Sequence, residues 1–260
     1  MLNATNYKLT VAYDGTRYNG WQVQSNSTGI QPLIQEAIRT ITRQEIILIG
    51  SGRTDAGVHA LGQVAHFKSS SQLNTHVMLY SLNGLLPRDI RIISMEEVPL
   101  TFHAQHSAVK KTYFYHLSLD PIQLPFRQLY SFHIRYSLDL AAMKAAAAEF
   151  LGTHDFTAFA NEAHRGSAAR NPVRTLYRLD IVSEPGAVRL EFEGSGFLYK
   201  MVRNITGILI EVASGKKTPS QVKSILESKD RRLAGAAAPP HGLFLMHVDY
   251  DVKTGSKNEE

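Results

Sequence analysis

The chain has 260 residues, of which 43% are hydrophobic and 20% are charged, so it is long enough to bury a core in one or two domains. This composition excludes a disordered or fibrous chain. The 28 Lys and Arg residues against 23 Asp and Glu give a formal net charge of +5, which is compatible with a phosphate-bearing partner.

The chain contains no cysteine, which excludes disulfides, thiol nucleophiles and thiolate metal sites. This is typical of proteins of the reducing cytoplasm. The first residues lack the basic and apolar segments of a secretory signal, and no stretch reaches the length of a membrane span. We therefore expect a cytoplasmic protein with no membrane partner.

The first part of the chain predicts alternating strands and helices. Large apolar residues alternate with other residues over 7–13, which is the period of a half-buried strand. Apolar residues recur at i, i+3 and i+4 over 30–41, which predicts an amphipathic helix. Similar arguments predict, in chain order, short strands at 46–49 and 63–67, a helix at 75–85 and a strand at 89–98.

The second part begins with two β-rich runs and contains more helix. The predicted elements are the runs 102–108 and 112–119, a helix at 138–151 ended by Gly152, a hairpin of 175–182 with 188–192, a helix at 197–214, a helix that opens with the capping box at 218–221, and a strand at 243–250. We divide the chain into an N-terminal half (1–105), a C-terminal half (106–250) and a polar tail (251–260). This order favours an α+β fold with antiparallel pairing and helices on one face.

Two stretches concentrate positive charge. Between residues 99 and 138 the only acid is Asp120, and basic residues and histidines are interleaved with Phe and Tyr. The stretch from 164 to 178 holds four arginines and no acid. Basic side chains pair with phosphates, and aromatic side chains stack on nucleobases. The two stretches together therefore predict a nucleic-acid interface. A solvated basic face over buried aromatic residues explains either stretch alone equally well.

Other kinds of site find little support. Gly50 and Gly52 are not followed by the third glycine of a dinucleotide-binding loop, because Asp55 stands at that position. The histidines at 59 and 66, or at 103 and 106, have no acidic or second histidine cluster near them in the sequence that would complete a metal site.

Residues 51–60 join two predicted strands through a loop bounded by small residues, which can present one side chain into a cleft. Asp55 follows Arg53 by two positions, and an aspartate beside a guanidinium is ionised at neutral pH. Such a carboxylate can act as a nucleophile or a base. An aspartate that caps a turn beside a surface arginine fits the same residues, and local chemistry alone favours it.

Residues 51–67 read S-G-R-T-D-A-G-V-H-A-L-G-Q-V-A-H-F, which resembles the active-site signature of the TruA-type tRNA pseudouridine synthases. Other segments resemble the same family in the same order, over about residues 7–250. They are 17–24, 83–90 (with Gly84 where the family usually has Ala), 110–115, 152–159, 201–207 and 238–243.

The resemblance implies an isomerase that converts uridine to pseudouridine at positions 38, 39 and 40 of the tRNA anticodon stem-loop, without a cofactor or a metal. It implies two RRM-like, or ferredoxin-like, halves that form one continuous, mostly antiparallel sheet with a central active-site cleft, and a homodimer that holds tRNA. It matches Asp55 with the catalytic aspartate and Tyr113 with the tyrosine that stacks on the target base. Arg53 and Arg203 match arginines that line the pocket.

We expect Arg203 to pair with Asp55 and to hold it ionised. A contact of Arg203 with an RNA phosphate alone is the alternative. The candidate contacts to the RNA backbone are Lys110, Lys111, Arg165, Arg170 and Arg174. Two other functions remain open from the residues: a non-catalytic RNA-binding protein of two RRM-like domains, and a metal-dependent nuclease or phosphatase, although the second needs acidic ligands that this sequence does not cluster.

Overall fold

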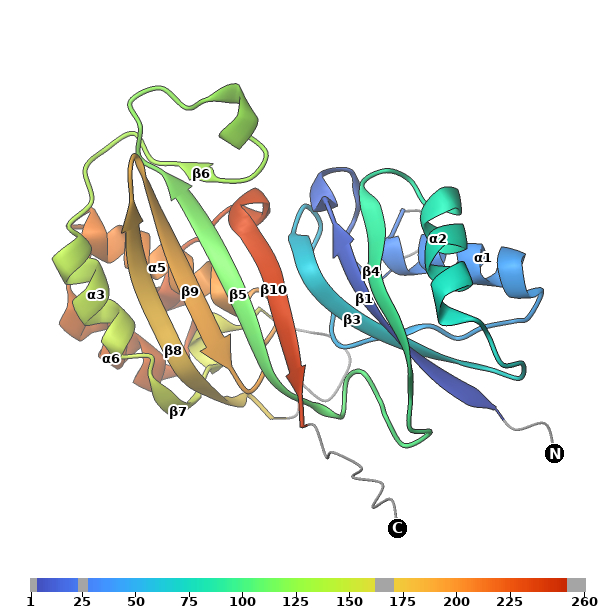
Figure 1. Cartoon of the computed structure of the whole chain (residues 1–260). Helices are drawn as coiled ribbons and strands as arrows, with labels where there is room; N and C mark the ends of the chain where they lie inside the picture. The colour runs from blue at the N-terminus through green and yellow to red at the C-terminus, as the bar shows by residue number, and fades with distance from the viewer. Residues whose placement is uncertain (1–3, 23–27, 162–170, 252–260) are drawn as a thin grey trace, which may run out of the picture.

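The computed structural model describes residues 4–22, 28–161 and 171–251. Within these residues the strands form one sheet in the order β4-β1-β3-β10-β5-β9-β8-β7, with β2 beside β3 and β6 beside β5 (Figure 1). The strands are β1 (Thr5–Tyr13), β2 (Ile49–Gly50), β3 (His59–Ser69), β4 (Ile90–Val98), β5 (Ala108–Ser118), β6 (Phe132–His133), β7 (Gly152–Asp155), β8 (Val173–Glu184), β9 (Ala187–Gly194) and β10 (Leu243–Tyr250).

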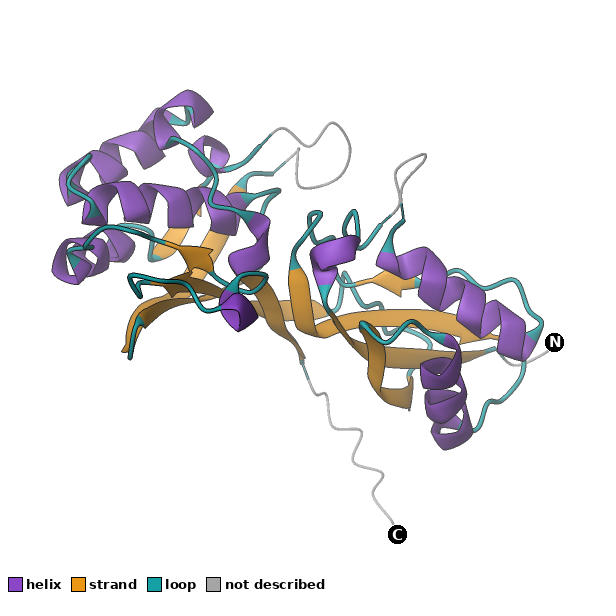
Figure 2. Cartoon of the chain, turned by 90° about the horizontal axis from the view of Figure 1, so that it is seen from above, coloured by secondary structure: helices purple, strands orange, loops and turns teal. Residues whose placement is uncertain are grey.

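The described α-helices lie on one face of this sheet or at its edge. They are α1 (Ile30–Thr42), α2 (Thr75–Leu85), α3 (Leu140–Ala148), α5 (Met201–Ala213) and α6 (Pro219–Ser228). Figure 2 shows α3, α5 and α6 on one side of the C-terminal strands and α1 on the same side of the N-terminal strands, whereas α2 packs beside the edge strand β4. The other face of the C-terminal strands carries no α-helix among the described residues, and we call it the open face. The predicted α+β class is confirmed.

Most neighbouring strands are antiparallel, as predicted, but the two halves meet through a parallel pair. β10 pairs with β3 only at Phe244 with His59 and at Leu245 with Ala60, whereas its antiparallel pairing with β5 runs from Leu243 to Tyr250. The last described strand therefore joins the two halves. The division near residue 105 stays a prediction, and of the tail only Asp251 lies within the described residues.

Strand β1 illustrates how the sequence builds the core. Tyr7, Leu9, Val11 and Tyr13 are all buried, as their alternation predicted. Gly62 of β3 shows a second requirement, because a Cβ there would lie 2.3 Å from a backbone oxygen of β10. A side chain at this position would push the two halves apart, so the join needs glycine.

Residues 102–107 form turns and irregular backbone rather than the predicted strand, and β5 begins at Ala108. The Phe102 N–H donates to the Pro99 carbonyl at 2.9 Å, and the side-chain amide of Asn6 donates to the carbonyls of both residues at 3.0 Å. The Phe102 ring packs against Tyr250, with the ring centroids 4.9 Å apart. The apolar residues that suggested a strand therefore bury a linker against the sheet.

Three other elements are shorter than predicted. Helix α3 ends at Ala148 rather than at residue 151, because the N–H groups of Phe150 and Leu151 donate to carbonyls three residues earlier, as in a turn. Leu48 stays outside β2 because side chains satisfy its backbone: its N–H donates to Gln35 Oε1 at 3.2 Å and its carbonyl accepts from Gln31 Nε2 at 2.6 Å. The helix predicted at 197–214 begins at Met201, because Lys200 takes a left-handed conformation with φ of 60°. None of the described helices is long and apolar enough to cross a membrane.

Candidate active site

The loop that carries Asp55 begins where β2 ends and is fixed to β3 at its start. The Ser51 N–H donates to the Val64 carbonyl at 2.7 Å, and the Ser51 hydroxyl donates to Gln63 Oε1, also at 2.7 Å. The amide nitrogen of Gln63 donates to the Gly52 carbonyl at 3.0 Å. One buried glutamine thus satisfies two successive residues of the loop.

The centre of the loop is held by the segment that follows β1. The Trp21 N–H donates to the Thr54 carbonyl at 3.2 Å, and the Thr54 hydroxyl shares a hydrogen bond of 2.8 Å with the Tyr13 hydroxyl. Gly20 has a φ of +92°, and a Cβ on it would lie 2.3 Å from the Thr54 oxygen. Only glycine combines this backbone conformation with so close an approach, so Gly20 sets the position of the residue next to Asp55.

Asp55 and Arg203 form an ion pair between the two halves. Asp55 Oδ2 lies 2.7 Å from Arg203 Nη1, and the two side chains are 17% and 12% exposed. Arg203 lies in the first turn of α5, and its Nε donates to the Ala238 carbonyl at 2.8 Å. The Ala238 N–H donates back to the Arg203 carbonyl at 2.9 Å. A guanidinium fixed by its own hydrogen bond to Ala238, on a residue whose backbone is also bound, orients the carboxylate.

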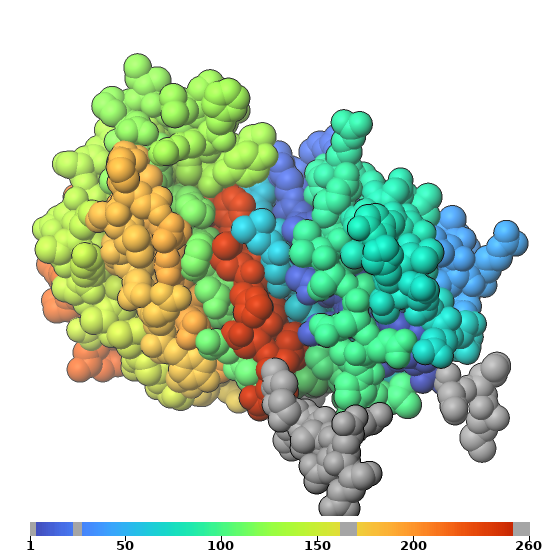
Figure 3. All heavy atoms as spheres, in the orientation of Figure 1, coloured from blue at the N-terminus to red at the C-terminus, as the bar shows by residue number. Residues whose placement is uncertain are grey.

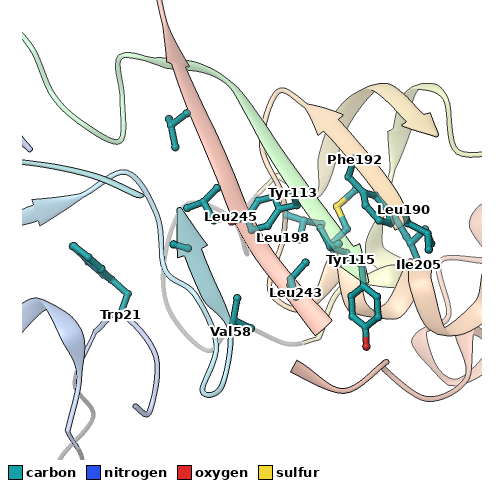
Figure 4. Close-up of a cluster of buried hydrophobic side chains, with 14 of the residues drawn as sticks. Trp21, Val58, Tyr113, Tyr115, Leu190, Phe192, Leu198, Ile205, Leu243 and Leu245 are labelled. Atoms are coloured by element: carbon teal, nitrogen blue, oxygen red, sulfur yellow. The ribbon is translucent and has the colours of Figure 1, made fainter. Parts of the chain in front are cut away.

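Tyr113 lies on β5 and is 9% exposed. Its ring meets Phe197 edge to face, with centroids 5.1 Å apart, and Figure 4 shows it in a buried cluster with Leu198 and Leu245. Burial raises the pKa of the Tyr113 phenol, and so do the nearby Tyr13 and Asp55, so the hydroxyl is neutral at physiological pH. The structure therefore brings together Asp55, Arg203 and Tyr113.

Lys111 reaches the Asp55 loop from the other half. Its Nζ donates to the Ser51 carbonyl at 2.7 Å. Burial, together with the charge of Arg174 on β8, lowers the pKa of the ammonium to about 8. Burial also lowers the pKa of Arg174, whose guanidinium donates to two carbonyls of its own strand end. These two cations lie on the face that carries Tyr113.

The remaining predicted residues are placed differently. Arg53 is exposed next to Asp55. Lys110 points to the open face, because neighbours in a strand alternate, and it pairs there with Glu193 at 3.3 Å and Asp249 at 3.5 Å. Arg165 and Arg170 lie outside the described residues.

Charge is distributed unequally between the two faces of the C-terminal strands. On the open face, seen in Figure 3, the arginines and the lysine are tied into ion pairs with carboxylates that outnumber them. The cations are Lys110, Arg178 and Arg189, and the carboxylates are Asp180, Glu184, Glu191, Glu193 and Asp249. An acidic open face repels phosphate, whereas Lys111 and Arg174 on the other face attract it.

Sequence reasoning missed three supports of the site: Gln63, Trp21 and Ala238. All three lie in segments that resemble the family, but nothing in their chemistry assigned them a role. In the parts of the chain that the structure describes, no three His, Asp or Glu side chains are grouped as a metal site.

Comparisons with known proteins agree on one family. A family model described as tRNA pseudouridine synthase matches residues 9–107 and 146–251. "tRNA pseudouridine synthase A 1" of Protochlamydia amoebophila (strain UWE25) is 56% identical over 250 residues, which cover 96% of this chain and 98% of that protein. "tRNA pseudouridine synthase A" of Citrifermentans bemidjiense is 45% identical and covers 95% of this chain and 98% of its own.

A relative of the same name from Thermoanaerobacter sp. (strain X514) is 43% identical, covering 94% of this chain and 99% of its own. Among solved structures, a chain of "Crystal Structure of a Cbf5-Nop10-Gar1 Complex" matches with a TM-score of 0.34 and 13% identity, over 78% of this chain and 54% of that one. This structural similarity is too low to support a statement about fold or function.

Proposed function

We propose roles for two residues from the premise that the chain belongs to the tRNA pseudouridine synthase family and is an isomerase of that kind. Asp55 is its catalytic residue, and Tyr113 is its base-stacking residue. The observation that carries this proposal is the ion pair of Asp55 with Arg203 at 2.7 Å, where the two halves meet beside Tyr113. We further propose that the substrates are the uridines at positions 38, 39 and 40 of the anticodon stem-loop.

The isomerisation breaks the N1–C1′ bond, turns the uracil over and joins C5 to C1′, and the proton of C5 is replaced by one on N1. The sugar gains positive character as the glycosidic bond breaks, and a carboxylate stabilises or traps such a centre. Attack of Asp55 on C1′ and removal of a ribose proton by Asp55 both fit its position. In both routes Arg203 orients the carboxylate before the substrate arrives.

The target base must leave the helical stem to reach a carboxylate between the two halves. Flipping costs a few kcal/mol, and stacking on an aromatic ring contributes about 1–3 kcal/mol per base, so Tyr113 can offset much of the cost. The Tyr113 ring now contacts Phe197. A base that stacks on the covered part of the Tyr113 ring takes the place of Phe197.

The proposed RNA path follows the face on which Arg174 and the exposed Arg53 lie, and it includes Arg165 and Arg170 on the sequence alone. Lys111 lies on the same face, but its ammonium is already bound to the Ser51 carbonyl. Lys110 is left out because it is paired with two carboxylates on the open face. A non-catalytic protein that binds RNA across its open sheet, as RRM-like domains do, is not favoured by the ion pairs of that face. We also propose that two copies hold one tRNA in the cytoplasm, which light scattering with and without tRNA tests.

The experiment follows tritium released from C5 of uridine in an anticodon stem-loop, in EDTA, by the wild type, Asp55→Ala and Asp55→Asn. Asp180→Asn, which removes a carboxylate from the open face, is the matched control. Release by the wild type and the control, and by neither Asp55 variant, supports a synthase that depends on Asp55 and needs no free metal. Release by Asp55→Asn refutes the assignment. Stem-loops with a single uridine at 38, 39 or 40 test the positions.

A further inference from the structure

The two halves share a short join in the sheet, and the candidate site spans it. The loop that carries Asp55 leads into β3, whereas Tyr113 lies on β5 beyond β10. β3 and β10 are paired at two positions only. The spacing between the carboxylate and the ring therefore depends on side chains that cross the join.

Lys111 is such a side chain. Its Nζ donates to the Ser51 carbonyl at 2.7 Å, and Ser51 is fixed on its other side by Gln63. Lys111 and Tyr113 are two residues apart on one strand, so they point to the same face. A single strand thus supplies the stacking ring and a contact with the start of the Asp55 loop.

We propose that Lys111 is a positioning residue, whose hydrogen bond to the Ser51 carbonyl sets the Asp55 loop at a fixed distance from Tyr113. This inference rests on the proposed function of Asp55. The sequence predicts a different role for Lys111, a contact with an RNA phosphate. In the structure the ammonium already has an acceptor in the Asp55 loop, the Ser51 carbonyl.

The surroundings of Lys111 oppose the burial of its positive charge. The ammonium forms no ion pair with a described carboxylate, its acceptor is a neutral carbonyl, and Arg174 adds a like charge nearby. Removing a lysine from water under these conditions is costly. An apolar side chain would fill the same space without that cost, so the lysine is best explained by what its hydrogen bond holds in place.

Gly52 makes room for this contact. A Cβ on Gly52 would lie 2.7 Å from Lys111 Nζ. The tip of a lysine moves readily, so Gly52→Ala would push the ammonium away from Ser51 and keep its charge. The two substitutions Lys111→Met and Gly52→Ala therefore break the same hydrogen bond in different ways, and only one of them removes a cation.

The experiment measures kcat in the tritium-release assay and the Kd for the stem-loop, after circular dichroism has shown that each variant is folded. Lys110→Met is the matched control, because it removes the neighbouring lysine from the open face. We expect kcat to fall by about 10-fold to 100-fold in Lys111→Met and Gly52→Ala, with Kd changed by less than about threefold. We expect Lys110→Met to keep the wild-type kcat.

Three results would overturn the inference. Weaker RNA binding at an unchanged kcat in Lys111→Met, with Gly52→Ala like the wild type, would make Lys111 a phosphate contact. Wild-type kcat and Kd in both variants would leave Lys111 without a role while Asp55 keeps its own. Activity in Asp55→Asn, run in parallel, would instead refute the proposed function itself. If Lys111→Met does not fold, Gly52→Ala decides alone: a lowered kcat supports the inference, and a wild-type kcat overturns it.

Discussion

Acidification should destabilise this fold through His66. The imidazole lies on β3 and is 4% exposed, and its Nδ1 accepts a hydrogen bond of 3.1 Å from the Ala104 N–H of the linker between the halves. The His103 ring lies 4.8 Å away, centroid to centroid. Burial, and then the proximity of His103, lowers the pKa of His66 to about 4.

The sign and size of the effect follow from proton linkage. The unfolded chain binds a proton at a pKa of about 6.5, whereas the folded protein resists protonation until about pH 4, so acid favours unfolding between these values. Each pKa unit corresponds to about 1.4 kcal/mol, which gives a loss of about 3 kcal/mol below pH 4 and about 2 kcal/mol between pH 7 and pH 5.

Urea unfolding at pH 7 and pH 5 measures this loss. The comparison is His66→Asn, whose side-chain oxygen can accept from the same N–H but does not titrate. Other groups titrate in both proteins, so the difference between the two pH dependences isolates His66. We expect the free energy of unfolding of the variant to fall by about 2 kcal/mol less than that of the wild type over this range.

An equal fall in both proteins would refute the reasoning, because it would mean that His66 is protonated as easily in the folded state as in the unfolded state. A lower stability of His66→Asn at both pH values would not, since it reports the lost packing of the ring. The pH dependence alone carries the prediction.

Three further predictions concern the join and the site. Gly62→Ala should lower the free energy of unfolding, measured in urea, by about 1–3 kcal/mol, because its Cβ would lie 2.3 Å from the Met246 oxygen. An unchanged urea midpoint would mean that β3 and β10 move apart at no cost. Arg203→Met should lower kcat in the tritium assay by at least about tenfold, since it leaves the Asp55 charge without its partner, and wild-type kcat would contradict this. Arg174→Ala should reduce the slope of log K against log salt by about 1 in stem-loop binding, and an unchanged slope would remove it from the RNA path.

Local patterns in the sequence predicted most elements, and long-range pairing accounts for most of what they missed. The helix at 75–85 and the strand at 243–250 were predicted residue by residue, because periodicity reports which side of an element is buried. No local signal could place the strand at 243–250 between β3 and β5, because its neighbours are set by contacts with residues more than a hundred positions away.

The candidate site shows the same division. The resemblance matched Asp55 and Arg203, which are 148 positions apart and which the structure joins in an ion pair. The alternation of a strand already implied that Lys110 and Lys111 face opposite ways, yet the basic stretch led us to treat them alike. The roles of Gln63 and Ala238 depend on backbone groups of other segments, and sequence does not reveal such contacts.

The central place of β10 also bears on the order of events during synthesis. Figure 1 shows this strand between segments that the ribosome delivers much earlier, and both β3 and β5 need it as a neighbour. Domains generally fold from the N-terminus during synthesis, and exposed strand edges make partly folded chains prone to aggregation. Until residues 243–250 emerge, the nascent chain therefore carries two unprotected edges, and the ion pair of Asp55 with Arg203 has no sheet to hold it together. The proposed catalytic centre is therefore assembled last, when β10 pairs with both β3 and β5.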